Sequence, residues 1–328
     1  MTNKLIPFVV GIFAAFISYN IYSKSHQTLD LTTNMSSPEM KAFEAPEVSK
    51  NVERIRAAAT PERPALSSDR GRWAMAWLHL VIWNSWKSAY FYADKYPEDD
   101  LHNYLEYALL SATFLAEHHE AEESALFPAL EKKIPGSMEQ NEAQHQAFLK
   151  PLEELIDFIR LAKAESKLDV GAYRGMVDSL VGPVMQHLAE ELDSLEGPKL
   201  LEHFSESELD EINKATHKAQ QGDTHRMLPF ILQVCPFDRN LPPGSPFPPA
   251  PGFVKTLLGP WVFYWKYSHL WKVSSIPITL SVDYQSFRSY SFVPPFSVYS
   301  LSYETNAFPS TSAVIPILTR VRLLPVEL

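Results

Sequence analysis

Residues 117–128 read "EHHEAEESALFP", which places two adjacent histidines among four carboxylates just before a phenylalanine–proline pair. On a helix, His118 and Glu122 share one face about one turn apart, because four residues separate them. A carboxylate that faces the core is costly unless it is paired or bound to a metal. His119 projects near the centre of the apolar stripe, so the projection alone does not favour His118. Such a pair alone is more typical of an exposed ion pair, and a metal site needs ligands from elsewhere in the chain.

The same spacing recurs at His187 and Glu191 within "MQHLAEELDSL", residues 185–195. Two other segments each carry one candidate histidine, His79 in "MAWLHLVIWNSW" and His145 in "NEAQHQAFLKPL". Together with the first pair, the chain offers four histidines and two glutamates from four segments. Imidazole-rich sites with carboxylates suit iron, with zinc or manganese as alternatives.

Four long segments carry apolar residues at a spacing of three and four, which predicts amphipathic helices. Short breaks separate them, so consecutive helices should be antiparallel neighbours in an all-α, up-down four-helix bundle. A further helix is expected to begin at "SESE", where a serine followed by acids suits an N-terminal cap. The five expected helices span about residues 70–94, 101–133, 138–164, 173–195 and 205–220.

Charge and cysteine content exclude several classes of partner and site. The formal charge is −10, from 39 acidic and 29 basic side chains, and no basic run offers a phosphate footprint, so we expect no nucleic-acid partner. The one cysteine, Cys235, cannot form an intramolecular disulfide or a cysteine-rich metal site. Any metal must therefore be held by histidine and carboxylate.

The N-terminus suggests a membrane anchor. An uncharged, mostly apolar run lies between Lys4 and Lys24, close to the minimum of about 20 residues for a spanning helix. We interpret residues 1–23 as a single-pass anchor; the alternative is a signal peptide that is cleaved in the secretory pathway. Residues 24–67 are polar with scattered prolines and are expected to form a linker with at most one short helix.

The chain after the anchor and linker divides by composition. Residues 68–222 contain the expected bundle, and residues 223–273 form an extension rich in proline and aromatic residues. Residues 274–328 have few charges and no helical period, and we expect an irregular tail to which no structure can be assigned. The acidic residues Glu120, Glu123 and Glu131 are expected on a solvated face of the bundle.

The four motifs together resemble the ligand-bearing helices of the hemerythrin-like (HHE cation-binding) family, with a likeness to its fungal branch, over about residues 70–235. The resemblance implies a non-haem di-iron centre with carboxylate bridges and an oxygen-binding role. The phenylalanine–proline pair at Phe127–Pro128 supports the register that chooses His118 over His119. The positions that match metal ligands of the family are His79, His118, Glu122, His145, His187 and Glu191.

One position departs from the family pattern, which commonly has a second histidine on the third helix, four residues after the first. Leu149 stands at that position, or Asn141 if His145 is the second of the pair. One metal would therefore lack an imidazole unless His119, Glu120 or water fills the gap. Because reversible oxygen carriage in the family depends on one saturated and one open iron, this difference puts that activity in doubt.

Three functions follow from these observations. The first is a metal-binding protein that holds non-haem iron and serves oxygen binding, iron storage or sensing. The second is a membrane-tethered di-iron oxidase or peroxidase, although the sequence shows no catalytic residue beyond the ligands. The third is a degenerate bundle that keeps the fold and no longer loads metal, for which Leu149 is the best argument.

Overall fold

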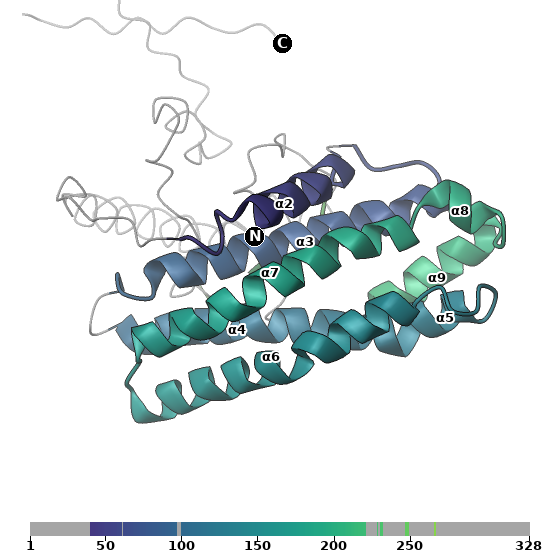
Figure 1. Ribbon diagram of the computed structural model, residues 1–328. Helices are drawn as coiled ribbons and strands as arrows, with labels where there is room; N and C mark the ends of the chain where they lie inside the picture. The colour runs from purple at the N-terminus through teal and green to yellow at the C-terminus, as the bar shows by residue number, and fades with distance from the viewer. Residues whose placement is uncertain are drawn as a thin grey trace, which may run out of the picture. The chain divides into compact units, whose positions relative to one another are not determined.

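The computed structural model describes residues 40–60, 62–96 and 100–220, with the single positions 228, 230, 231, 247, 248 and 266. These residues contain helices and turns and no strand, which confirms the all-α prediction. In Figure 1, four long helices run side by side. They pack as a ring in which each helix contacts two others. The four are α3 (Ser67–Tyr92), α4 (Leu101–Ala121), α6 (Glu139–Glu165) and α7 (Val170–Ser194).

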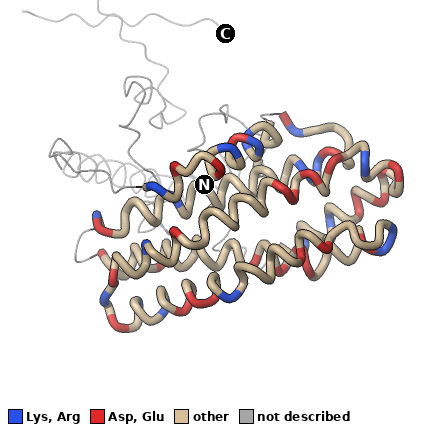
Figure 2. Tube along the Cα trace, viewed as in Figure 1, with Lys and Arg blue, Asp and Glu red and all other residues tan. Residues whose placement is uncertain are grey.

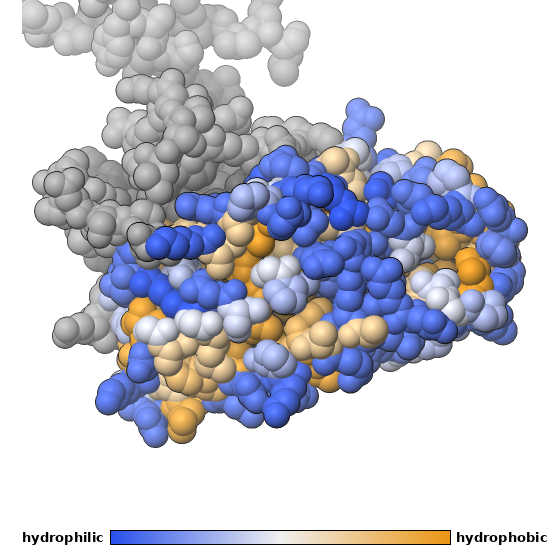
Figure 3. All heavy atoms as spheres, in the orientation of Figure 1, coloured by the Kyte–Doolittle hydropathy of each residue, from blue (hydrophilic) through white to orange (hydrophobic). Residues whose placement is uncertain are grey.

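The core of the bundle comes from the apolar stripe of each helix. Trp77 of α3, Leu115 of α4, Leu152 of α6 and Val184 of α7 are fully buried. Removing such side chains from water is the main favourable term in folding. Lysine, arginine, aspartate and glutamate are spread along the helices (Figure 2), and the face drawn in Figure 3 is largely hydrophilic with apolar patches between helices. The sequence periodicity thus identified the buried faces.

The second predicted helix, residues 101–133, is not one regular α-helix. After α4 the backbone forms a π-helical segment (Glu122–Leu126), where the N–H of Phe127 donates to the carbonyl of Glu122, and α5 (Phe127–Glu131) follows. Pro128 has no N–H to donate and clashes with the preceding turn, which disfavours a continuous α-helical ladder here. Single π-turns occur frequently at functional sites. This turn begins at a predicted ligand.

Part of the predicted linker belongs to the folded bundle. Helix α2 (Pro46–Ala58) lies within the range 24–67, and it packs against α3 and α7. Val48, Val52 and Ile55 form its buried face. Pro46 stands in the first turn, where proline favours a helix start because its missing N–H would have no partner there. The linker was expected to contain at most one short helix; α2 is such a helix, and it packs on the bundle.

Two shorter helices close one end of the bundle. Helix α8 (Gly197–Leu201) precedes α9 (Glu206–Ala219), and α9 starts with the capping box of Ser205 and Glu208 that "SESE" predicted. Helix α9 packs against α3 and the π-helical segment. Its Glu206 accepts hydrogen bonds from the backbone N–H groups of Ser67 (2.6 Å) and Ser68 (3.2 Å). This carboxylate caps the start of α3, which has no side-chain cap of its own.

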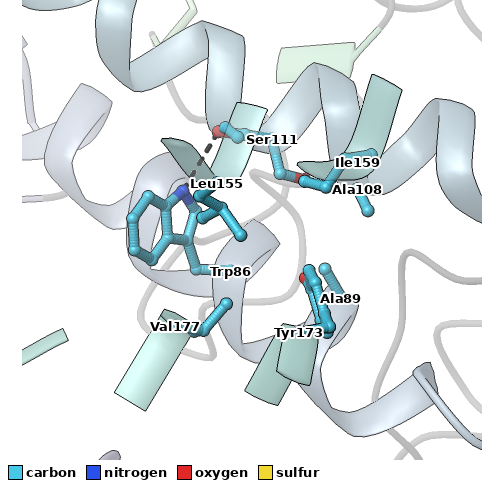
Figure 4. A pocket seen from close by; sticks show the side chains of 9 residues that line it. Trp86, Ala89, Ala108, Ser111, Leu155, Ile159, Tyr173 and Val177 are labelled. Carbon is cyan, nitrogen blue, oxygen red and sulfur yellow. Dashed lines mark hydrogen bonds between the residues drawn. The ribbon is translucent and has the colours of Figure 1, made fainter. Parts of the chain in front are cut away.

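Between the middle sections of the four long helices, the core is closely packed. A cavity of about 10 Å³ lies between Trp86, Ser111 and Tyr173 (Figure 4), which is room for at most one water molecule. Trp86 donates a hydrogen bond of 3.0 Å to the carbonyl of Ser111. On α3 this cavity is seven residues from His79, a separation of about 10 Å along the helix. No charged side chain or histidine lines this cavity, so it is not a candidate metal site.

Predictions about both ends of the chain fall outside the described residues. These are the anchor at residues 1–23, the first part of the linker, most of the extension at 223–273 and the tail at 274–328. Among the helices that the structure describes, none is long and apolar enough to cross a membrane.

Candidate metal centre

All six predicted ligands lie in the interior of the bundle, and a seventh side chain joins them. That side chain is His119, which is 6% exposed. Every other member is equally buried, although imidazoles and carboxylates are rarely buried without a partner. The seven come from α3 (His79), from α4 and its π-helical extension (His118, His119, Glu122), from α6 (His145) and from α7 (His187, Glu191).

The seven side chains form two groups whose donor atoms lie within 4.8 Å of one another in each group. Glu122 belongs to both groups. The first group consists of His79, His118, Glu122 and Glu191. The second group consists of His119, Glu122, His145 and His187. Two adjacent positions with one shared carboxylate are what a pair of bridged metal ions requires.

The distances in the first group are those of converging ligands. Nε2 of His79 lies 3.2 Å from Nε2 of His118 and 3.2 Å from Oε2 of Glu191. Nε2 of His118 lies 2.9 Å from Oε1 of Glu122. Both imidazoles therefore turn the same nitrogen toward one point between three helices.

The second group repeats this arrangement on the other side of Glu122. Nε2 of His145 lies 2.9 Å from Nε2 of His187 and 3.6 Å from Oε2 of Glu122. The two oxygens of Glu122 thus approach different groups. The ring of His119 lies 4.1 Å from that of His145 and 5.2 Å from that of His187, measured between centroids. His119 therefore stands in the second group, where Leu149 leaves the third helix without a second histidine.

Hydrogen bonds on the outer nitrogens set the tautomers of the second group. Nδ1–H of His187 donates to Oε1 of Gln144 (3.0 Å), whose amide orientation is fixed because its Nε2 donates to Glu190 (2.7 Å). Nδ1–H of His145 donates to Oε1 of Glu123 (2.9 Å). Each Nε2 then carries a lone pair, and two lone pairs 2.9 Å apart repel unless a cation lies between them. Such outer partners orient metal-bound histidines and raise their basicity.

Glu123 and Glu131 were expected on a solvated acidic face; Glu123 is exposed and Glu131 half-exposed, and each also has a specific partner. Glu123 contacts His145, and Glu131 accepts hydrogen bonds from the backbone N–H groups of Gly136 (2.7 Å) and Met138 (2.6 Å). Glu120 is exposed as expected. Gln144 was not singled out from the sequence, because a polar residue one position before His145 carries no signal of its role until α7 is in place.

Burial decides the charge states of the site. Desolvation lowers the pKa of all five imidazoles, and it lowers the pKa of His118 to about 4. At neutral pH they are uncharged, which is the form that binds metals. Burial raises the pKa of Glu122, helped by the neighbouring Glu191, and burial also raises the pKa of Glu191. None of the four oxygens of these two carboxyls accepts a hydrogen bond of normal geometry within the described part of the chain.

These observations fit bound metal ions. Carboxylate oxygens without hydrogen bonds leave a desolvation cost of about 1–3 kcal/mol each unless a cation compensates it. The donor set contains nitrogen and carboxylate oxygen and no sulfur, as the sequence required. The sequence suggested a choice between His118 and His119 as the ligand. In the structure no choice is needed, because His118 belongs to the first group and His119 to the second.

Comparisons with known proteins agree with this picture. Residues 93–196 match the model of the hemerythrin HHE cation binding domain. The chain is 31% identical over 160 residues to the dimeric xanthone biosynthesis cluster protein R11 of Cryptosporiopsis sp. (strain 8999), a match that covers 47% of this chain and 58% of that protein. No solved structure matches. The resemblance to the hemerythrin-like (HHE cation-binding) family that the four motifs predicted is therefore confirmed over residues 93–196, while His79 lies before the matched range.

Proposed function

We propose that this chain is a metal-binding protein whose bundle holds two non-haem iron ions on either side of Glu122. The observation that carries the proposal is the pair of buried donor groups that share one carboxylate. His79, His118 and Glu191 would hold the first ion. His119, His145 and His187 would hold the second.

The donor chemistry favours iron. Imidazole-rich coordination with carboxylate suits iron, zinc and manganese, and a bridging carboxylate between two ions is typical of non-haem di-iron proteins. When bound, a pair of iron ions supplies one-electron redox capacity and affinity for oxygen. The chain itself supplies neutral imidazoles, a carboxyl shared by both positions and outer hydrogen bonds that fix ring orientation. The roles that we propose for such a centre are oxygen binding, iron storage or iron sensing.

His119 bears on whether the second position can load. Without a second histidine on α6, the second group would have two imidazoles and Glu122. With His119 it has three, which supports two metals over one. The same count weighs against a degenerate bundle, because His119 supplies the second group with the imidazole that Leu149 does not.

A second candidate function is oxidation of a small molecule by the same centre. A pocket of about 450 Å³ between α4 and α6 is lined by His119 and His145. Pockets of a few hundred Å³ next to reactive groups are the usual form of substrate sites. The name of the similar protein R11 places that protein in a biosynthetic cluster.

Metal analysis of the full chain tests the proposal. The protein is purified after iron-replete expression, its metals are quantified by mass spectrometry, and its visible absorption is recorded. We expect about two iron ions per chain and absorption bands that disappear on chelation. Glu122→Ala should abolish both, while Glu120→Ala, at an exposed position of the same helix, should change neither. A wild-type metal content near zero would contradict the proposal, and two zinc ions would contradict its choice of iron.

A further inference from the structure

The pocket between α4 and α6 reaches one of the two donor groups. Its volume is about 450 Å³. The side chains that line it are Ala116, His119, Glu120, Glu123, Ser124, His145, Phe148, Leu149, Leu152 and Glu153. His119 and His145 belong to the second group, whereas His79, His118 and Glu191 of the first group do not line the pocket. This pocket therefore gives access to the second donor group.

At the buried end of this pocket, one imidazole nitrogen has no hydrogen-bond partner. His119 is 6% exposed, and its Nε2 has no hydrogen-bond partner among the described residues. His145 lies beside it, and its Nδ1 donates to Glu123, an exposed residue. Glu123 thus connects the solvent side of the pocket to a buried imidazole.

The solvent side of the pocket is negative. Glu120, Glu123 and Glu153 are exposed, and no lysine or arginine lines the pocket. Within the described part of the chain, Glu120 and Glu153 form no ion pair, so their charges are not neutralised locally. A cleft lined by one sign of charge raises the local concentration of the opposite ion.

We propose that this pocket is the loading port through which hydrated divalent cations reach the second donor group. This inference rests on the proposed metal centre. A cation with six water molecules needs about 180 Å³, at about 30 Å³ per water, and the pocket has more than twice that space. The carboxylates attract the ion, and the imidazoles replace its water.

The remaining wall of the port is apolar, so it would let a cation pass without binding it. Phe148, Leu149 and Leu152 offer no ligand atom to an ion in the pocket. Leu149 is 39% exposed and forms part of this wall. With leucine there, the first imidazoles that an incoming cation meets are His119 and His145.

The rate of metal binding tests the port separately from the metal centre itself. The full chain is stripped with a chelator and mixed with Co²⁺ in a stopped-flow spectrometer, and the rate and final number of bound ions are read from visible absorption. The test variant is Glu120→Gln with Glu153→Gln. The matched control is Glu142→Gln with Glu165→Gln, which removes the same charge from exposed positions of α6 outside the pocket. Glu123 is left intact because it orients His145.

We expect the test variant to bind Co²⁺ about tenfold more slowly than the control at low ionic strength, and less than about twofold more slowly at about 0.5 M salt. The final number of ions per chain should be unchanged in both. Equal rates for test and control at low ionic strength would overturn the loading port and leave the metal centre standing. A wild-type chain that binds no Co²⁺ would overturn both.

Discussion

Glu122→Gln should change the stability of the metal-free and metal-bound proteins in opposite directions. Glu122 is fully buried, both its oxygens lack hydrogen bonds, and it is the one member of both donor groups. Glutamine has nearly the same shape and carries no charge. In the metal-free protein it removes a carboxyl whose pKa is raised by burial, and in the metal-bound protein it removes the bridge.

The two effects differ in size as well as in sign. Relief of the buried carboxyl is worth on the order of 1–3 kcal/mol and should raise the Tm of the metal-free protein. A metal at 100 times its Kd stabilises the wild type by about 2.7 kcal/mol for each site. For a domain of this size, 1 kcal/mol corresponds to about 2–4 °C. One site should therefore raise the wild-type Tm by about 5–10 °C, and the variant should lose most of this rise.

Thermal unfolding with and without metal measures both effects of Glu122→Gln. The wild type, Glu122→Gln and the control Glu120→Gln are stripped of metal and melted in parallel, before and after addition of Fe²⁺ under anaerobic conditions or of Co²⁺ in air. Glu120→Gln should behave as the wild type, because Glu120 belongs to neither group. A Glu122→Gln protein that keeps the full metal-dependent rise in Tm would refute the shared-carboxylate reasoning. A Glu122→Gln protein with a lower Tm than the wild type in the absence of metal would refute it as well.

Three further outcomes follow from the same geometry. His118→Ala and His119→Ala should each lower the metal content by about one ion per chain, because they belong to different groups; a loss in only one variant, by metal analysis, would assign the site to that histidine alone. Leu149→His should tighten metal binding to the second group, seen by titration with Co²⁺, and cost little stability because the position is 39% exposed; an unchanged affinity with a lower Tm would contradict this. The Tm of the metal-free protein should fall between pH 7 and 5, because the unfolded state binds protons at the histidines below pH about 6.5 while the folded state resists them. For His118, with a pKa of about 4, the loss is about 2 kcal/mol at pH 5. Glu122 and Glu191 oppose this loss, because their raised pKa values let the folded state bind protons first, but they are two groups and the imidazoles are five. A Tm that rises on acidification would show that the carboxyls dominate.

The long helices could be predicted because their signal is local. The third was expected at about residues 138–164 and spans Glu139–Glu165. Apolar spacing reports which face is buried wherever the helix is regular. The π-helical segment at Glu122–Leu126 has no such signal, since one shifted hydrogen bond changes the register without changing the composition. One short helix was allowed in the linker, but α2 could not be placed there, because scattered prolines interrupt the apolar spacing of that stretch.

The site could be predicted only as far as single helices determine it. Spacing of four residues identified His118 with Glu122 and His187 with Glu191, and both pairs are buried. The structure then divides the second pair, with His187 in one group and Glu191 in the other. That division depends on how α7 faces its neighbours, which no spacing within α7 encodes.

His119 is a second case in which packing between helices, and not spacing within one helix, determines the site. A choice between His118 and His119 assumed that only one of two adjacent side chains could face the interior. In this bundle the interior wraps around α4, because α3 lies against one side of it and α6 against the other. Both histidines are therefore buried, about 100° apart on one helix. Tertiary packing decided this, and the sequence pattern left it open.

The central claim is that two metal ions lie on either side of Glu122, and anomalous X-ray diffraction tests it most directly. Crystals of the full chain loaded with iron, measured at the iron absorption edge, should show two separate peaks joined by this carboxylate. One peak should lie among the side chains of His79, His118 and Glu191, and the other among those of His119, His145 and His187. A single peak, or peaks away from Glu122, would contradict the account.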